Sequence, residues 1–184
     1  MTRYFLTFIM LMLALMTMPS SAQEMTKAEM ASIRAAYSAA KEKIEFNSHA
    51  QEQNIPRSDM EIVSHYVIPG CGPTEEIIHY YFTLDEDPVL GTPYYKLYFI
   101  STSYNVAARK YYQEFLFSED ESELLFFFQS NDALDGGTDE TRYYYGKQGV
   151  HKSINGTAEL DEVFAARKAD ELKTAFTHLM NKDY

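Results

Sequence analysis

The sequence predicts an α+β fold, in which an antiparallel β-meander of about six strands carries an N-terminal and a C-terminal helix packed on one face. Three observations lead to this class. Apolar residues recur at helical spacing near each end of the chain. Between the ends, apolar and polar residues alternate at every second position. The alternating segments are separated by stretches rich in Gly, Pro and acidic residues, which are typical of turns.

Residues 1–22 predict a secretory signal peptide. The positive residue Arg3 precedes a continuous apolar run over residues 4–16, and the small residues Ser20 and Ala22 occupy the positions that a signal peptidase reads. The apolar run is too short to span a bilayer. We therefore expect a signal peptide over 1–22, a single α+β domain over 23–184, and a periplasmic or secreted location.

Length, charge and cysteine usage narrow the class of the mature protein. The 162 residues that would remain after cleavage are enough for one hydrophobic core. They include 15 basic and 27 acidic residues, a net charge of −12, which argues against nucleic acid or an anionic membrane surface as a partner. Cys71 is the single cysteine, so no disulfide can form within the chain and stability must come from packing.

Residues 26–46 predict the first helix. Thr26 and Glu29 have the spacing of a capping box, in which each side chain accepts a hydrogen bond from the backbone of the other residue. Apolar residues then recur on one helical face: Ile33, Ala36, Tyr37, Ala40 and Ile44. The polar segment 47–59, which contains Pro56, ends the helix.

The centre of the chain predicts a series of strands joined by hairpin turns. One segment, 104–116, fits a helical stripe as well as a strand. The alternation from Lys110 onward and the acidic turn at 118–122 favour the strand. The expected strands are 60–68, 75–84, 94–102, 110–117, 123–130 and 140–146.

Residues 160–180 predict the second helix. Thr157 is a candidate for its cap, and Asp161 and Glu162 suit the positive end of the helix dipole. Its apolar face comprises Leu160, Val163, Phe164, Leu172, Phe176, Leu179 and Met180.

The strands predict a sheet with two chemically different faces. Because successive side chains point to opposite faces, Phe and Leu gather on one face and Tyr with charged residues on the other. We expect the Phe and Leu face to form the core under both helices. The second face would hold the residues that bind a ligand or partner: His79, Tyr81, Lys96, Tyr98, Tyr112, Glu114, Arg142 and Tyr144.

Three interpretations of this tyrosine-rich face stay open. It can be a solvated surface built from residues with high β-propensity. It can bind another protein or a second copy of the chain, since Tyr and Arg are enriched at interfaces. It can also bind a small molecule or a glycan, although the chain has 15 Tyr and 12 Phe but no Trp, the ring on which sugars stack best.

An enzymatic alternative is a thiol- or metal-dependent hydrolase around Cys71, His65 and His79. A hairpin turn at 69–74 would place the two histidines at nearly opposite positions of adjacent strands and expose the thiol. However, strand side chains point perpendicular to the sheet, away from a thiol at the hairpin tip, and no Asn or Asp is placed to orient either histidine. The sequence therefore favours a protein without catalytic residues, cofactor or metal.

Several stretches together carry a resemblance: "IRAAYSAAKEKI", "VIPGCGPTEEIIHYYF", "YNVAARKYYQEFLF" and "ETRYYYG". With them the chain resembles secreted proteins of unassigned function from gut and oral Bacteroidetes. The resemblance covers most of the mature chain, implies an exported or periplasmic protein, and supplies no catalytic residues. Taken with the tyrosine-rich face, it leads us to expect an exported, non-enzymatic binding or interaction module.

Overall fold

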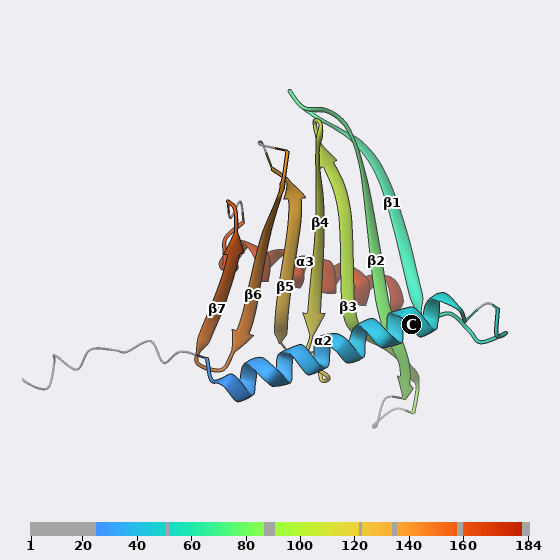
Figure 1. Ribbon diagram of the computed structural model, residues 1–184. Helices are drawn as coiled ribbons and strands as arrows, with labels where there is room; N and C mark the ends of the chain where they lie inside the picture. The colour runs from blue at the N-terminus through green and yellow to red at the C-terminus, as the bar shows by residue number, and fades with distance from the viewer. Residues whose placement is uncertain are drawn as a thin grey trace, which may run out of the picture.

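A computed structural model describes residues 25–50, 52–86, 91–121, 123–133, 136–157 and 160–181. The predicted signal peptide, residues 1–22, lies outside the described residues. Within them the chain forms two helices and a seven-stranded sheet (Figure 1). The elements are α2 (Lys27–Ser48), β1 (Asp59–Ile68), β2 (Gly72–Glu86), β3 (Pro93–Val106), β4 (Arg109–Phe117), β5 (Leu124–Asp132), β6 (Thr138–Gly146), β7 (Gly149–Asn155) and α3 (Glu162–Met180).

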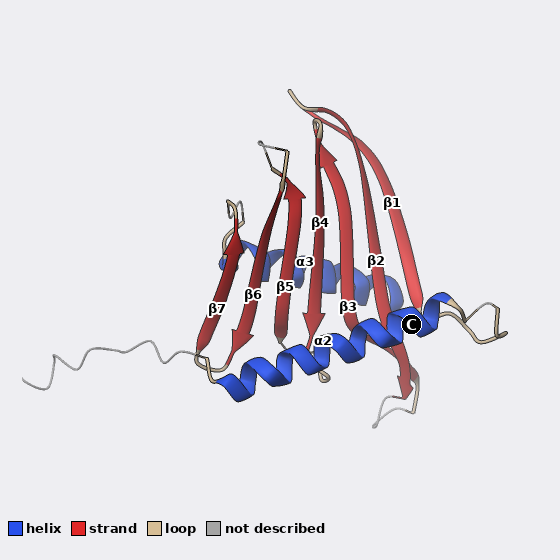
Figure 2. Cartoon of the chain, viewed as in Figure 1, coloured by secondary structure: helices blue, strands red, loops and turns tan. Residues whose placement is uncertain are grey.

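The sheet is an antiparallel meander whose spatial order, β1 to β7, is the order of the strands in the chain (Figure 2). This confirms the α+β class and the antiparallel sheet. One strand, β7, was not predicted. It is an edge strand in which Val150 alone is partly buried, so its sequence "GVHKSIN" lacks the alternation that identifies a half-buried strand.

The segment with two interpretations, 104–116, is a strand hairpin. β3 continues to Val106, the chain turns at Ala107 and Ala108, and β4 begins at Arg109. Ala107 has a positive φ of 53°, which a tight turn between two strands requires. The prediction of a strand from Lys110 onward is confirmed.

Both helices begin at a side-chain cap. In α2, the predicted capping box is present: the Thr26 hydroxyl accepts from the Glu29 backbone N–H, and the Glu29 carboxylate accepts from the Thr26 backbone N–H. In α3, Asp161 is the cap and accepts from the backbone N–H of Phe164 at 2.8 Å. The expectation that Thr157 caps α3 is wrong, because a cap directly precedes the first helical residue and the helix begins at Glu162.

The two helices pack on opposite faces of the sheet, so the prediction that both share one face is wrong. Figure 1 shows α2 in front of the strands and α3 behind them. α3 buries Ala165, Ala169 and Phe176 in one apolar cluster, and α2 buries Ile33 and Ala40 in another. We call the two sides of the sheet the α2 face and the α3 face.

Each face has its own aromatic core, which explains why each can hold a helix. The α3 face contributes Leu97, Phe115 and Phe127, whereas the α2 face contributes Phe99 and Phe126. The predicted segregation of Phe from Tyr therefore fails. A helix can bury apolar area on either side of such a sheet.

Two irregularities in the strand register redistribute these side chains. The β2–β3 pairing runs from Tyr81 opposite Phe99 directly to Phe82 opposite Leu97, so Tyr98 has no partner in β2. Tyr98 and Phe99 consequently both join the α2-face cluster, while Leu97 lies on the α3 face. A second shift lies between Leu116 and Phe117 in the β4–β5 pairing, and there Leu125 and Phe126 both join the α2-face cluster.

Candidate functional site

The residues predicted to bind a ligand or partner share the α2 face, but α2 covers part of it. Tyr81, Tyr98 and Tyr144 belong to the apolar cluster that α2 packs on. His79 stacks on Tyr81 with a centroid distance of 6.1 Å. Lys96 lines a cavity together with residues of α2.

The other three predicted residues lie close to α2. Glu114 accepts hydrogen bonds from two α2 side chains, and Tyr112 donates to the same carboxylate. Arg142 lines a cavity beside α2. Glu114 is only 3% exposed and Tyr144 only 8%. The part of this face under α2 is therefore an interior layer, whereas His79 and Arg142 keep 32% and 34% of their side-chain surface exposed.

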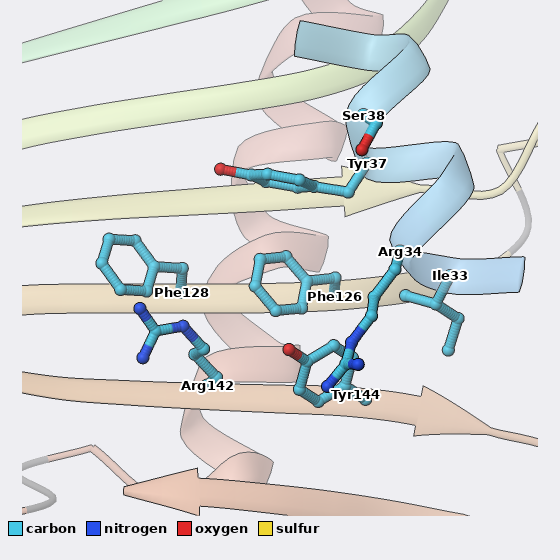
Figure 3. A pocket seen from close by; sticks show the side chains of 8 residues that line it. All are labelled: Ile33, Arg34, Tyr37, Ser38, Phe126, Phe128, Arg142 and Tyr144. Atoms are coloured by element: carbon cyan, nitrogen blue, oxygen red, sulfur yellow. The ribbon is translucent and has the colours of Figure 1, made fainter. Parts of the chain in front are cut away.

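A cavity of about 380 Å³ lies between the first half of α2 and strands β5 and β6, and two others, of about 410 and 520 Å³, lie further along α2. Figure 3 shows the lining of the first cavity, with the side chains from β5 and β6 as the floor and those from α2 as one wall. The lining residues are Ile33, Arg34, Tyr37, Ser38, Phe126, Phe128, Arg142 and Tyr144.

The floor of the cavity is aromatic because of how β5 and β6 pair. Phe126 lies opposite Tyr144 and Phe128 lies opposite Arg142, with all four side chains on the α2 face. The Phe126 and Tyr144 ring centroids are 4.9 Å apart. From the helix, Tyr37 meets Phe126 edge to face at 5.1 Å. These contacts hold the rings in fixed positions at the cavity floor, where Phe126 is 5% and Tyr144 8% exposed.

Two charged residues line the cavity, Arg34 and Arg142, and each carries a guanidinium group. Arg142 lies 4.9 Å from the centre of the Phe128 ring and forms an ion pair with Glu140, Nη1 to Oε2, at 2.9 Å. Arg34 lies 5.7 Å from the centre of the Tyr144 ring. Within the part of the chain that the structure describes, Arg34 has no hydrogen bond or ion pair, so its donors face the cavity mouth and solvent.

Next to the cavity, the buried carboxylate of Glu114 joins α2 to the sheet. It accepts from the Tyr37 hydroxyl at 2.6 Å, the Tyr112 hydroxyl at 2.7 Å and the Lys41 ammonium at 2.9 Å. Burial and the Glu114 carboxylate raise the pKa of Tyr37 and of Tyr112 well above the ordinary value of tyrosine. These contacts fix Tyr37, and with it one wall of the cavity.

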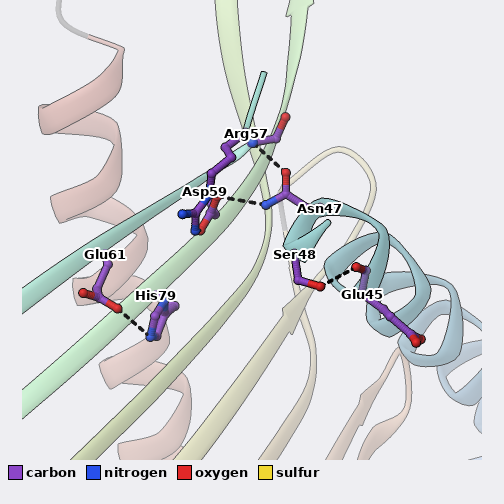
Figure 4. Close-up of polar contacts among 8 residues, drawn as sticks. Glu45, Asn47, Ser48, Arg57, Asp59, Glu61 and His79 are labelled. Carbon is purple, nitrogen blue, oxygen red and sulfur yellow. Dashed lines mark hydrogen bonds and ion pairs between the residues drawn. The ribbon is translucent and has the colours of Figure 1, made fainter. Parts of the chain in front are cut away.

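The far end of α2 is attached to the start of β1 by polar contacts, which Figure 4 shows. The Asn47 amide donates to the Asp59 carboxylate at 2.9 Å and accepts from the Ser58 backbone N–H at 2.8 Å. Arg57 donates to Asp59 through Nε at 2.8 Å. Helix α2 is thus held to the sheet by polar contacts at its middle and at its end.

The groups of the enzymatic alternative are not brought together. His65 lies opposite Glu75 and His79 opposite Glu61, so the histidines are separated by four positions along the hairpin rather than facing each other. Each is near its own carboxylate, with His79 Nε2 3.2 Å from Glu61 and His65 Nδ1 3.6 Å from Glu75. Among the described residues, no group of three His, Cys, Asp or Glu side chains is arranged to hold a metal ion.

Arg34, Tyr37 and Ser38 were not predicted as site residues. The sequence places them on the first helix, which was expected on the opposite face, and Tyr37 was assigned to the apolar stripe of that helix. Phe126 and Phe128 were assigned to the Phe and Leu face, which was expected to form the core under both helices. A signal that could have identified the wall is the pair Arg34 and Ser38, two polar residues four positions apart that border the apolar stripe.

Comparison with protein-family models, with curated proteins and with solved structures finds no match for this chain. Among the described residues, neither α2 nor α3 has the combination of length and apolar character that a bilayer-spanning helix needs. The functional assignment therefore depends on the geometry of the α2 face.

Proposed function

We propose that the protein is an exported, non-enzymatic binding module whose ligand site is the cavity between α2 and the tyrosine-rich face of the sheet. The observation that carries the proposal is the cavity of about 380 Å³, which has an aromatic floor and, at its edge, the guanidinium of Arg34, which has no ion pair among the described residues. Its size falls in the range of small-molecule sites, and its lining is mainly apolar with a few polar groups.

A small molecule suits this face better than a protein partner does. A protein partner needs a broad accessible patch, and α2 buries the residues at the centre of the face, among them Glu114 and Tyr144. The space left open beside α2 is divided among three cavities of about 380, 410 and 520 Å³. The periplasmic or secreted location belongs to the same proposal and is supported by the signal-peptide pattern at residues 1–22.

The non-enzymatic character rests on how the polar groups of the site are used. The Glu114 carboxylate already accepts three hydrogen bonds, so it is not available as a general base. The Arg142 guanidinium is paired with Glu140. The cavity lining contains neither a cysteine nor a histidine.

A cavity-filling substitution tests the proposed site. Ser38 is exposed on α2 and lines the cavity, so Ser38→Trp places an indole in the space without disturbing the core. Ser32 is exposed on the same helix but does not line the cavity, and Ser32→Trp is the matched control. The protein and both variants are screened against one set of aromatic and aliphatic fragments by saturation-transfer NMR.

We expect fragments that bind the unmodified protein and Ser32→Trp to lose their signal with Ser38→Trp. If every fragment binds all three proteins equally, or if no fragment binds the unmodified protein, the cavity is not a binding site and the proposal is wrong.

A further inference from the structure

We infer that the ligand of the α2-face cavity is a small organic anion, with a flat apolar body on the Phe126 and Phe128 rings and an acidic group bound by Arg34. This inference rests on the proposed function and names the chemical class of its ligand. A carboxylate, a phosphate ester and a sulfate share the required chemistry, because each presents oxygens to a guanidinium fork.

The first argument is the charge of the cavity lining compared with that of the protein. The whole chain has a net charge of −11. The lining nevertheless contains two arginines and no Asp or Glu. The other cavities described on the molecule all include a carboxylate: Glu42, Asp85 and Glu119, or Glu75. A lining with only cationic charge in such an acidic protein favours an anionic ligand.

The second argument is that one of the two cations lacks an anionic partner. Arg142 is neutralised by Glu140 at 2.9 Å, and the nearby Glu114 is engaged by Lys41. Arg34 makes no hydrogen bond or ion pair within the described residues, and its guanidinium lies over the Tyr144 ring. A cation–π contact of this kind does not use the guanidinium N–H donors, so they can bind an oxyanion.

The third argument concerns the arrangement of donors around the aromatic floor. Arg34 and Ser38 are four residues apart on α2 and therefore lie on the same side of the helix, at the same cavity. Figure 3 shows Arg34 reaching down from α2 and Arg142 rising from β6, with the Phe126 ring between them in this view. A ligand lying on the floor would present its acidic group to the Arg34 guanidinium beside Tyr144, while Ser38 borders the cavity at the opposite end of the view.

Two fluorescent probes with the same ring system separate charge from apolar contact. One is 1-anilinonaphthalene-8-sulfonate, which carries a sulfonate, and the other is neutral N-phenyl-1-naphthylamine. Their dissociation constants are measured by fluorescence titration for the full protein and for Arg34→Gln, Arg34→Lys and Ser38→Trp. The matched control is Arg167→Gln, which removes an exposed guanidinium that lies 4.5 Å from the Phe164 ring on α3.

We expect the sulfonate probe to bind about tenfold more tightly than the neutral probe, as a charge-assisted hydrogen bond allows. Arg34→Gln should remove this difference, Arg34→Lys should keep most of it, and Arg167→Gln should change neither probe. Ser38→Trp should weaken both probes.

Each contrary outcome has a distinct meaning. If Ser38→Trp weakens both probes but Arg34→Gln changes neither, the cavity binds ligands without a preference for anions, and only the present inference is overturned. Equal loss of both probes in Arg34→Gln would show that Arg34 supports the fold of the wall, which also overturns it. If Ser38→Trp affects neither probe, the probes bind elsewhere, and the proposed function is overturned together with the inference.

Discussion

Glu114 has a structural role that its sequence context does not reveal. In "KYYQEFLF" it occupies a position that alternation assigns to a polar face, yet it is almost fully buried. Two hydroxyls and an ammonium surround its carboxylate and compensate the cost of burying the charge. A buried acid that satisfies donors from both a helix and a strand connects the two elements in one orientation.

Glu114→Gln should lower the free energy of unfolding by about 1–3 kcal/mol. The amide has one acceptor oxygen instead of two, and its NH₂ group meets Lys41 and a tyrosine hydroxyl that donate in the native protein. Urea unfolding followed by circular dichroism measures the change. The control is Glu45→Gln, an exposed acid on α2, which should stay within about 0.5 kcal/mol of the unmodified protein. An equally small effect of Glu114→Gln would contradict this role.

At the scale of elements, α3 contributes to the core mainly through one aromatic residue. Phe176 is 1% exposed and stacks on Tyr80 and lies against Phe82, with ring centroids 5.5 Å apart in both pairs. Ala165 and Ala169, about three and two turns nearer the start of the helix than Phe176, are small enough to let α3 approach the strands closely. The position of Phe176 on the helical stripe was predicted from the sequence.

Phe176→Ala should cost about 3–5 kcal/mol of unfolding free energy, because it leaves a cavity between α3 and strand β2. Leu179→Ala is the control on the same helix. Leu179 is 47% exposed, and its truncation should cost less than about 1 kcal/mol. Thermal and urea unfolding of both variants provide the comparison. Similar losses for the two variants would mean that α3 is not anchored through Phe176.

The elements themselves were largely predictable, but the sides on which they pack were not. The helical spacing around Ile33 and Phe176 and the alternation in six strands are local patterns, and the structure contains these elements. The face of each side chain depends on register, and the bulge at Tyr98 shifts the alternation by one residue. Nothing in "YYKLYFIST" marks that bulge, so Phe99 was assigned to the wrong side.

The same limitation explains the incomplete prediction of the site. The shared face of Tyr112, Arg142 and Tyr144 follows from alternation within strands, which sequence shows directly. The cavity depends on which face α2 covers, and that is decided by the competition between two aromatic faces of one sheet. Arg34 and Ser38 resemble ordinary exposed helix positions until the helix is placed on its strands.

Over the whole molecule, the burial of tyrosines should make the free energy of unfolding depend on pH in the alkaline range. Burial raises the pKa of Tyr98 to about 12, and burial with the Glu121 hydrogen bond raises the pKa of Tyr94 to about 12. Burial also raises the pKa of Tyr145, and that of Tyr37 with the added effect of Glu114. In the unfolded chain these groups ionise near pH 10, so the folded state binds more protons above that pH.

The stabilisation from these neutral tyrosines should be complete below about pH 10 and be lost as the pH rises through about 12. The urea concentration at the midpoint of unfolding is measured at pH 8, 10 and 11. It should therefore decrease between pH 10 and pH 11. Absorbance at 295 nm should show a set of tyrosines that ionises only when the circular dichroism of the sheet is lost. In urea, all tyrosines of the chain should titrate together near the ordinary value. Reversible titration of every tyrosine near pH 10 in the folded protein would contradict this prediction.

The strands lie in the sheet in the same order as in the chain, and this has a consequence for how the sheet and α2 come together. Each strand finds its partner in the segment just before it, and the short connections make these hairpins fast to close. Helix α2 is synthesised before every strand, but Tyr37 and Lys41 reach Glu114 across 77 and 73 positions of the chain. The native contacts of α2 and the cavity beside it therefore require that β4, β5 and β6 are in place. A chain whose sheet is complete but whose α2 has not yet docked would lack the cavity, because α2 supplies one of its walls.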